Sequence, residues 1–126
     1  MLMPALLFVA LSDPGYWVCG ARNNATNGHY TLCPGSLIKI YALGAGACKA
    51  GSKGPKQFMV EVAGSRGAPP RWELYTFFTA ARLRNDYFRD MRPGEFAPPP
   101  PGGWYAVDAA APAPTLRNDT TATGCG

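Results

Sequence analysis

The chain has few of the large apolar residues that usually fill a protein core. Leu, Ile, Val and Phe together number 23 of its 126 residues, a low share for a domain that folds on apolar burial alone. Its 15 glycines and 13 prolines favour short elements and long loops. The net charge of +4 is modest, which argues against a disordered chain. We therefore expect one small domain that needs covalent staples.

Signatures of catalysis and of cofactor binding are also missing. His29 is the only histidine, and no Cys-x-x-Cys or His-x-x-x-His spacing for a metal occurs. The acidic residues are scattered, without a recognisable carboxylate pair, and no phosphate-binding or dinucleotide fingerprint is present. We expect a protein that is not an enzyme, with no cofactor and no catalytic or metal-binding residues. The alternative hypothesis is a small secreted enzyme or toxin that uses His29 and a free cysteine.

Long hydrophobic runs are absent as well. No run reaches the roughly 18 apolar residues that a membrane-spanning helix needs, so we expect no membrane span within this chain. The N-terminal segment MLMPALLFVAL is shorter and is interpreted as an apolar strand that ends at a turn over Asp13-Pro14-Gly15.

The chain does have two features of a secreted or extracellular protein. The triplets Asn24-Ala25-Thr26 and Asn118-Asp119-Thr120 fit the acceptor pattern for N-glycosylation, which predicts glycans on Asn24 and Asn118. Four cysteines are enough for two disulfides, which form in oxidising compartments. The sequence leaves three pairings open: Cys19–Cys33 with Cys48–Cys125, Cys19–Cys48 with Cys33–Cys125, and Cys19–Cys125 with Cys33–Cys48.

The stretch SDPGYWVCGA carries a recognisable spacing. Asp13, Gly15, Trp17 and Cys19 follow the pattern D-x-G-x-aromatic-x-C, which resembles the E–F corner and F strand of variable-type domains of the immunoglobulin superfamily. The resemblance covers residues 5–44, with an E strand before the corner and a G strand over 36–44. It implies a small antiparallel β-sandwich in which the glycine permits the bend and the cysteine points inward. The family's B-strand Cys and C-strand Trp would precede this corner, so we expect a domain that is incomplete at its N-terminal side.

Patterns in the remaining sequence predict a mainly β, disulfide-stapled fold. Aromatic and β-branched residues predict strands over 30–33, 37–43, 57–63, 72–79 and 104–107. After Ala80, Arg82, Asp86 and Asp90 follow one another at intervals of four, which predicts at most one short helix or a loop. The sequence predicts a β-rich domain over 1–96 and a Pro/Ala/Thr-rich tail or stalk over 97–126.

Positive charge is concentrated in the middle of the chain. Residues 39–92 contain ten Lys or Arg against four Asp or Glu. Lys49, Lys53 and Lys56 fall in one Gly-rich segment, which predicts weak binding of an acidic protein or a glycosaminoglycan. An oxidising compartment argues against nucleic acid. The sequence thus favours an extracellular or viral-surface glycoprotein that acts as a binding module, recognising a protein partner through its loops.

Overall fold

A computed structural model describes most of the chain, and the residues that it describes are 15–35, 37–44, 47–49, 54–79, 81–92, 95, 99–107, 112–118 and 125. The strand expected before Asp13 lies outside these residues. Within them, eight β-strands form one antiparallel sheet in the order β7-β6-β5-β4-β3-β2-β1-β8. They are β1 (Tyr16–Cys19), β2 (Gly28–Leu32), β3 (Ile40–Leu43), β4 (Lys56–Val62), β5 (Arg71–Thr79), β6 (Arg82–Asp90), β7 (Tyr105–Ala106) and β8 (Thr115–Asn118).

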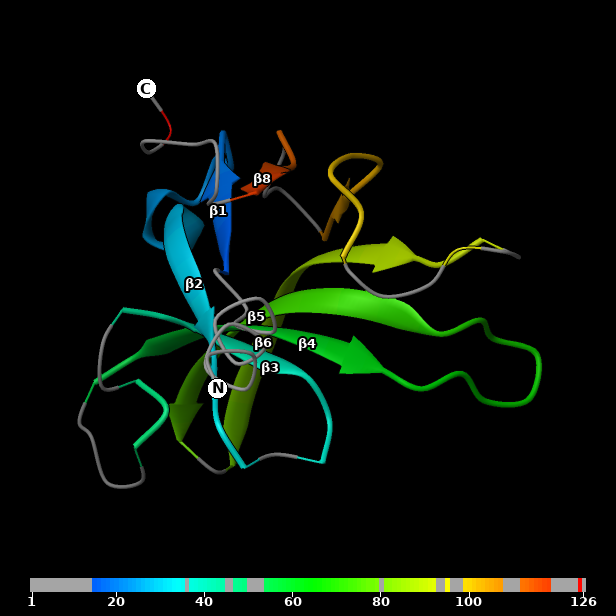
Figure 1. Ribbon diagram of the computed structural model, residues 1–126, viewed down its shortest axis with the longest axis horizontal. Coiled ribbons are helices and arrows are strands. Elements are labelled where there is room, and N and C mark those ends of the chain that lie inside the picture. The colour runs from blue at the N-terminus through cyan, green and yellow to red at the C-terminus, as the bar shows by residue number, and fades with distance from the viewer. Residues whose placement is uncertain are drawn as a thin grey trace, which may run out of the picture.

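The sheet is curled into a half-barrel, and the mainly β prediction is confirmed (Figure 1). Strands β1 to β6 follow one another as neighbours, while β8 returns to pair with β1. The G strand expected over 36–44 corresponds to β3, which does not pair with β1 because β2 lies between them. The immunoglobulin-like sandwich stays a prediction.

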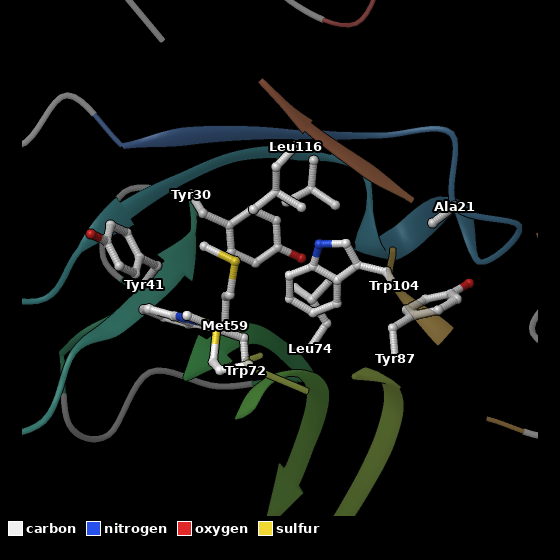
Figure 2. Packing of buried hydrophobic residues seen from close by; sticks show 11 residues of the cluster. Ala21, Tyr30, Tyr41, Met59, Trp72, Leu74, Tyr87, Trp104 and Leu116 are labelled. Atoms are coloured by element: carbon white, nitrogen blue, oxygen red, sulfur yellow. The ribbon is translucent and has the colours of Figure 1, made fainter. Parts of the chain in front are cut away.

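Aromatic side chains fill the concave side of the half-barrel. The largest fully buried residues include Trp72, Tyr30, Tyr41 and Tyr87. Tyr30 lies near the middle of the buried cluster, with Tyr41 and Tyr87 on opposite sides of it (Figure 2). Because each buried aromatic ring removes about 150–250 Å² from water, these residues compensate for the shortage of aliphatic side chains.

The C-terminal part of the chain contributes to the same core. Within the range expected as a tail or stalk, β7 pairs with β6 and β8 pairs with β1. Trp104 and Leu116 are buried in the aromatic cluster, and the Trp104 indole N–H donates to the Pro100 carbonyl over 3.0 Å. These residues belong to the packed sheet.

The prediction of a short helix or loop after Ala80 is wrong, because residues 82–90 form strand β6. The charged side chains pair at the two-residue spacing of a strand: Arg84 Nε lies 2.7 Å from Asp86 Oδ1. A register shift next to Leu74 inserts Asp86 as an extra residue, so that both Asp86 and Tyr87 are buried. Asp86 accepts a 2.6 Å hydrogen bond from the Thr76 hydroxyl, which satisfies part of its buried charge.

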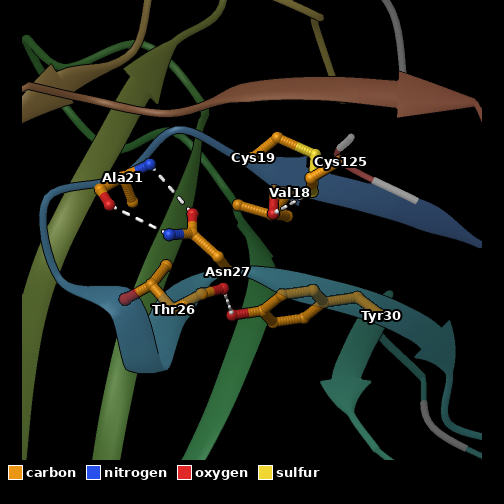
Figure 3. Close-up of a disulfide and its surroundings, with 7 residues drawn as sticks. All are labelled: Val18, Cys19, Ala21, Thr26, Asn27, Tyr30 and Cys125. Carbon is orange, nitrogen blue, oxygen red and sulfur yellow. Dashed lines mark hydrogen bonds between the residues drawn. A yellow bond between two sulfur atoms is a disulfide. The ribbon is translucent and has the colours of Figure 1, made fainter.

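The connection between β1 and β2 contains the only helical element of the described residues, the 3-10 helix η1 (Asn24–Thr26). The Asn27 side chain bonds both the N–H and the carbonyl of Ala21 at 2.9 Å, and the Tyr30 hydroxyl donates to the Thr26 carbonyl over 2.6 Å (Figure 3). These bonds fix the position of the first predicted glycosylation site relative to the core.

Candidate functional site

A surface cavity of about 400 Å³ lies beside one of the two disulfides. We call it the disulfide groove, and its lining consists of Cys33, Pro34, Gly35, Ile40, Ala47, Cys48, Lys49, Lys56, Phe58, Tyr75 and Phe77. Its volume falls within the range of roughly 300–1,000 Å³ that is typical of ligand sites. Its lining combines aromatic rings, a disulfide and two lysines, which makes the groove a candidate binding site.

Three aromatic rings from two adjacent strands line the groove. In β4 and β5 the side chains of Met59 and Leu74 face the core, so the alternation of a strand turns Phe58, Tyr75 and Phe77 to the convex face. Phe58 and Tyr75 are cross-strand partners with stacked rings at a centroid distance of 5.5 Å. Phe58 also meets Phe77 edge to face at 6.3 Å. All three rings are half-exposed.

The wall of the groove is the loop closed by the Cys33–Cys48 disulfide, which spans 15 positions in the sequence. The Cys33 N–H donates to the Ile40 carbonyl over 2.7 Å, which holds the base of this loop together. Beyond that base, the side chains of Leu37 and Ile38 are 106% and 54% exposed. Two consecutive aliphatic residues of this loop therefore stand in water.

Positive charge gathers at this end of the sheet. Lys49 and Lys56 line the groove, and none of the described lining residues is acidic. Lys56 begins β4 and is paired with Phe77, near the turn that joins β5 to β6. Arg82 and Arg84 at the start of β6 lie at the same end. The third lysine of the predicted patch, Lys53, lies outside the described residues.

The opposite end of the same strands carries the exposed or half-exposed carboxylates. Glu61 is paired with Trp72, Glu73 with Phe88, and Asp90 with Arg71, all far along the strands from Lys56. Glu73 lies two residues before Tyr75 on the same face of β5 and is paired with Arg71 at 2.6 Å, while the buried Asp86 already accepts from Arg84. The groove end therefore presents a positive surface to solvent.

Tyr75 supplies a polar group within the aromatic lining. Its partial burial, and next the nearby charge of Glu73, raise the pKa of its phenol above the ordinary value. The hydroxyl consequently keeps its proton at neutral pH and is available as a hydrogen-bond donor to a ligand. Neither the groove nor its aromatic residues were predicted from the sequence, which pointed only to the lysines.

The cysteines pair as Cys19–Cys125 and Cys33–Cys48, which is one of the three pairings left open. Because all four are bonded, the hypothesis of a catalytic free cysteine beside His29 has no thiol. The His29 ring instead packs against the Trp17 ring, with 5.0 Å between the ring centroids and 34° between the ring planes. No group of three metal-ligating side chains occurs among the described residues.

The two predicted glycosylation sites lie near opposite ends of strand β1. Asn24 is exposed at the start of η1, whereas the Thr26 of its acceptor triplet is buried. Asn118 is the last residue of β8, paired with Tyr16. Glycosylation at both sites stays a prediction. Among the described residues, no helix combines the length and the apolar character needed to cross a membrane.

Comparisons with protein-family models, with curated proteins and with solved structures find no match to this chain.

Proposed function

We propose that the chain is an extracellular or viral-surface glycoprotein module that binds a protein partner through the loops at the groove end. A binding role is supported by exposed apolar side chains and lysines at one end of the sheet, because protein interfaces combine an apolar centre with a polar rim. The two disulfides support an oxidising compartment such as the cell exterior.

The observation that carries this proposal is the exposure of Leu37 and Ile38. A fully exposed leucine followed by a half-exposed isoleucine leaves apolar surface in water, and contiguous surface of this kind marks interaction sites. We call Leu37 and Ile38 the apolar tip of the loop. The Cys33–Cys48 disulfide at the base of the loop limits the freedom of the chain, so less conformational entropy is lost when a partner covers the tip.

Charge at the same end would set the type of partner. The tip continues into the exposed Lys39, and Lys49 and Lys56 line the neighbouring groove. Complementary charge accelerates encounter and disfavours partners of like charge. The partner is therefore a protein with an acidic surface around an apolar depression that receives the tip.

The immunoglobulin-like fold is a further part of the proposal. It is supported by the turn before β1, where Gly15 has a φ of +84° that favours glycine, as the resemblance implies for the corner. Cys19 follows on the same strand and is buried. An experimental structure of the chain together with any preceding segment would show whether a second sheet packs on the first.

The proposal is tested by binding of the fluorescently labelled, glycosylated protein to a panel of intact animal cells. We expect saturable binding that trypsin treatment of the cells removes. The variant Leu37→Asp/Ile38→Asp should bind at least about tenfold more weakly, the size expected for loss of an interface anchor. Tyr105→Asp, at an aromatic residue that is 62% exposed on the edge strand β7, is the matched control.

Equal binding of the tip variant and the parent protein would overturn the proposal. Absence of saturable binding to every cell type would do the same, as would binding that trypsin leaves unchanged. Circular dichroism melting curves of both variants establish that each is folded before binding is compared.

A further inference from the structure

The disulfide groove differs from the apolar tip in the chemistry that it offers. The tip is aliphatic, whereas the groove combines the faces of aromatic rings with two ammonium groups. A protein partner with an acidic surface accounts for the tip and for the positive charge, but not for the aromatic rings of the groove, so the groove offers a site for a second ligand.

We propose that the disulfide groove binds a sulfated glycosaminoglycan chain, with one sugar ring against Tyr75 and its sulfate or carboxylate groups at Lys49 and Lys56. This inference rests on the proposed function, because it names a second ligand for the same end of the module. The glycosaminoglycan is the chain of a proteoglycan at the cell surface.

The aromatic lining supports a ring-shaped ligand. The face of an aromatic ring is electronegative, and the C–H groups on one face of a pyranose are weakly electropositive. Tyr75 and Phe58 are stacked with only 24° between their planes, so Phe58 backs one face of Tyr75 and leaves the other face to contact a sugar ring. The Tyr75 hydroxyl, which has no hydrogen-bond partner among the described residues, stands in the lining to meet a sugar hydroxyl.

The charges support an anionic ligand that is extended. Lys49 and Lys56 enter the groove from different segments, a loop and the start of a strand, so two anionic groups can be met along one chain. Arg82 and Arg84 lie at the same end of the sheet, but their guanidinium groups lie over the Phe78 ring and Arg84 pairs with Asp86, so the two lysines are the cations of the groove itself. No described acidic residue lines the groove, and Glu73, which lies further along the same face of β5, is paired with Arg71.

Competing ligand classes fit less well. An acidic peptide can pair its carboxylates with the lysines, but it brings no ring to pack against the aromatic faces. A neutral sugar satisfies the rings but brings no anion to the ammonium groups. A lipid chain needs an aliphatic cavity, and apart from Ile40 and Ala47 the apolar side chains of this lining are aromatic or proline.

The test compares two polyanions by isothermal titration calorimetry. The probes are a heparin-derived octasaccharide and poly-L-glutamate of matched charge, which has no sugar rings. Tyr75→Thr should weaken the octasaccharide about three- to tenfold, the size of an aromatic contact, and poly-L-glutamate less than about twofold. Tyr75→Phe keeps the ring and should stay close to the parent protein with the octasaccharide. Lys56→Gln should weaken both probes.

Two further variants complete the experiment. Tyr105→Thr removes an exposed ring elsewhere and should change neither affinity, while Phe77→Thr repeats the test within the groove in case Tyr75→Thr does not fold. Equal weakening of both probes by Tyr75→Thr, or no weakening of the octasaccharide, would overturn the inference. So would a parent protein that does not bind the octasaccharide.

The two proposals fail in distinguishable ways. Leu37→Ser/Ile38→Ser removes the apolar tip without adding charge and leaves the groove lysines and rings in place, so it should keep octasaccharide affinity within about twofold while cell binding falls. If cell binding is insensitive to the tip but Tyr75→Thr selectively weakens the octasaccharide, the partner proposal fails and the groove inference stands. The reverse result removes the groove inference alone.

Discussion

Cys19 and Cys125 are joined by a disulfide although 106 positions separate them in the sequence. Cys19 ends β1, which pairs with both β2 and β8, and the Cys125 Sγ lies 3.4 Å from the Val18 carbonyl oxygen. The bond thus ties the C-terminal end of the chain to a strand near its beginning. In the unfolded chain it would close a loop that includes nearly all of the sheet.

The length of that loop leads to a stability prediction. In the chain-entropy model, Cys19→Ser/Cys125→Ser should lower the free energy of unfolding by about 4–5 kcal/mol, against about 3 kcal/mol for Cys33→Ser/Cys48→Ser with its much shorter loop. Urea titration followed by tryptophan fluorescence measures both. A larger loss of unfolding free energy for Cys33→Ser/Cys48→Ser than for Cys19→Ser/Cys125→Ser would contradict this prediction.

Gly15 is predicted to tolerate no side chain. Its φ is +84°, and a Cβ there would come within 2.2 Å of the Tyr30 carbonyl oxygen, a backbone atom of the neighbouring strand. Gly15→Ala should cost more than about 2 kcal/mol, since strain at positive φ adds to a steric clash. Gly20→Ala is the control, because the φ of Gly20 is similar at +81° but a Cβ added there would meet no other atom within 4 Å. Similar melting temperatures for the two variants would refute the close approach of Gly15 to β2.

Tyr30 is predicted to make the fold sensitive to alkaline pH. Burial, and next the charge of Asp86, raise its pKa well above the ordinary value of 10.0. The unfolded chain therefore loses the phenolic proton first, so this stability is fully present below about pH 10 and declines as pH rises further. Tyr30→Phe should flatten the decline of the urea midpoint above about pH 10 and leave its pH dependence below about pH 10 as in the parent protein. Tyr105→Phe, at an exposed tyrosine, should leave the slope as in the parent protein, and an unchanged slope for Tyr30→Phe would contradict the prediction.

Asn24 is predicted to carry a glycan when the protein is made in a eukaryotic secretory host. Its exposed position in η1 leaves room for a bulky, hydrated group outside the core. Intact mass before and after removal of N-glycans should differ, and Asn24→Gln should lose one glycan. A peptide map with only unmodified Asn24 would refute this.

The strand pattern was largely predictable, but the identity of the core was not. Alternating aromatic and β-branched residues predicted the strands around Tyr41, Met59 and Trp72, and the continuous antiparallel register of β3, β4 and β5 confirms them. Counting aliphatic residues suggested a thin core, whereas tyrosines and tryptophans fill it. Sequence alternation could not show this, because both faces of β4 and β5 carry apolar side chains.

Two features depended on tertiary structure. The Arg–Asp spacing of β6 is compatible with a helix, whereas pairing with β5 along its length and with β7 on its other edge makes it a strand. The groove exists because the Cys33–Cys48 loop lies beside Phe77 in the folded protein. These residues are far apart in the sequence, so no sequence pattern indicated that they meet. The lysines were predicted because a charge cluster is visible in the sequence itself.

The central claim is that Lys49 and Lys56 act through their place at the groove, and not through net charge alone. Retention on a heparin column in a salt gradient tests it with two double variants of equal charge change. Lys49→Glu/Lys56→Glu should elute at clearly lower salt than Arg66→Glu/Arg92→Glu, whose exposed residues lie at the opposite end of β4 and β6. Elution of both variants at the same salt concentration would show that only total charge matters and would contradict the account.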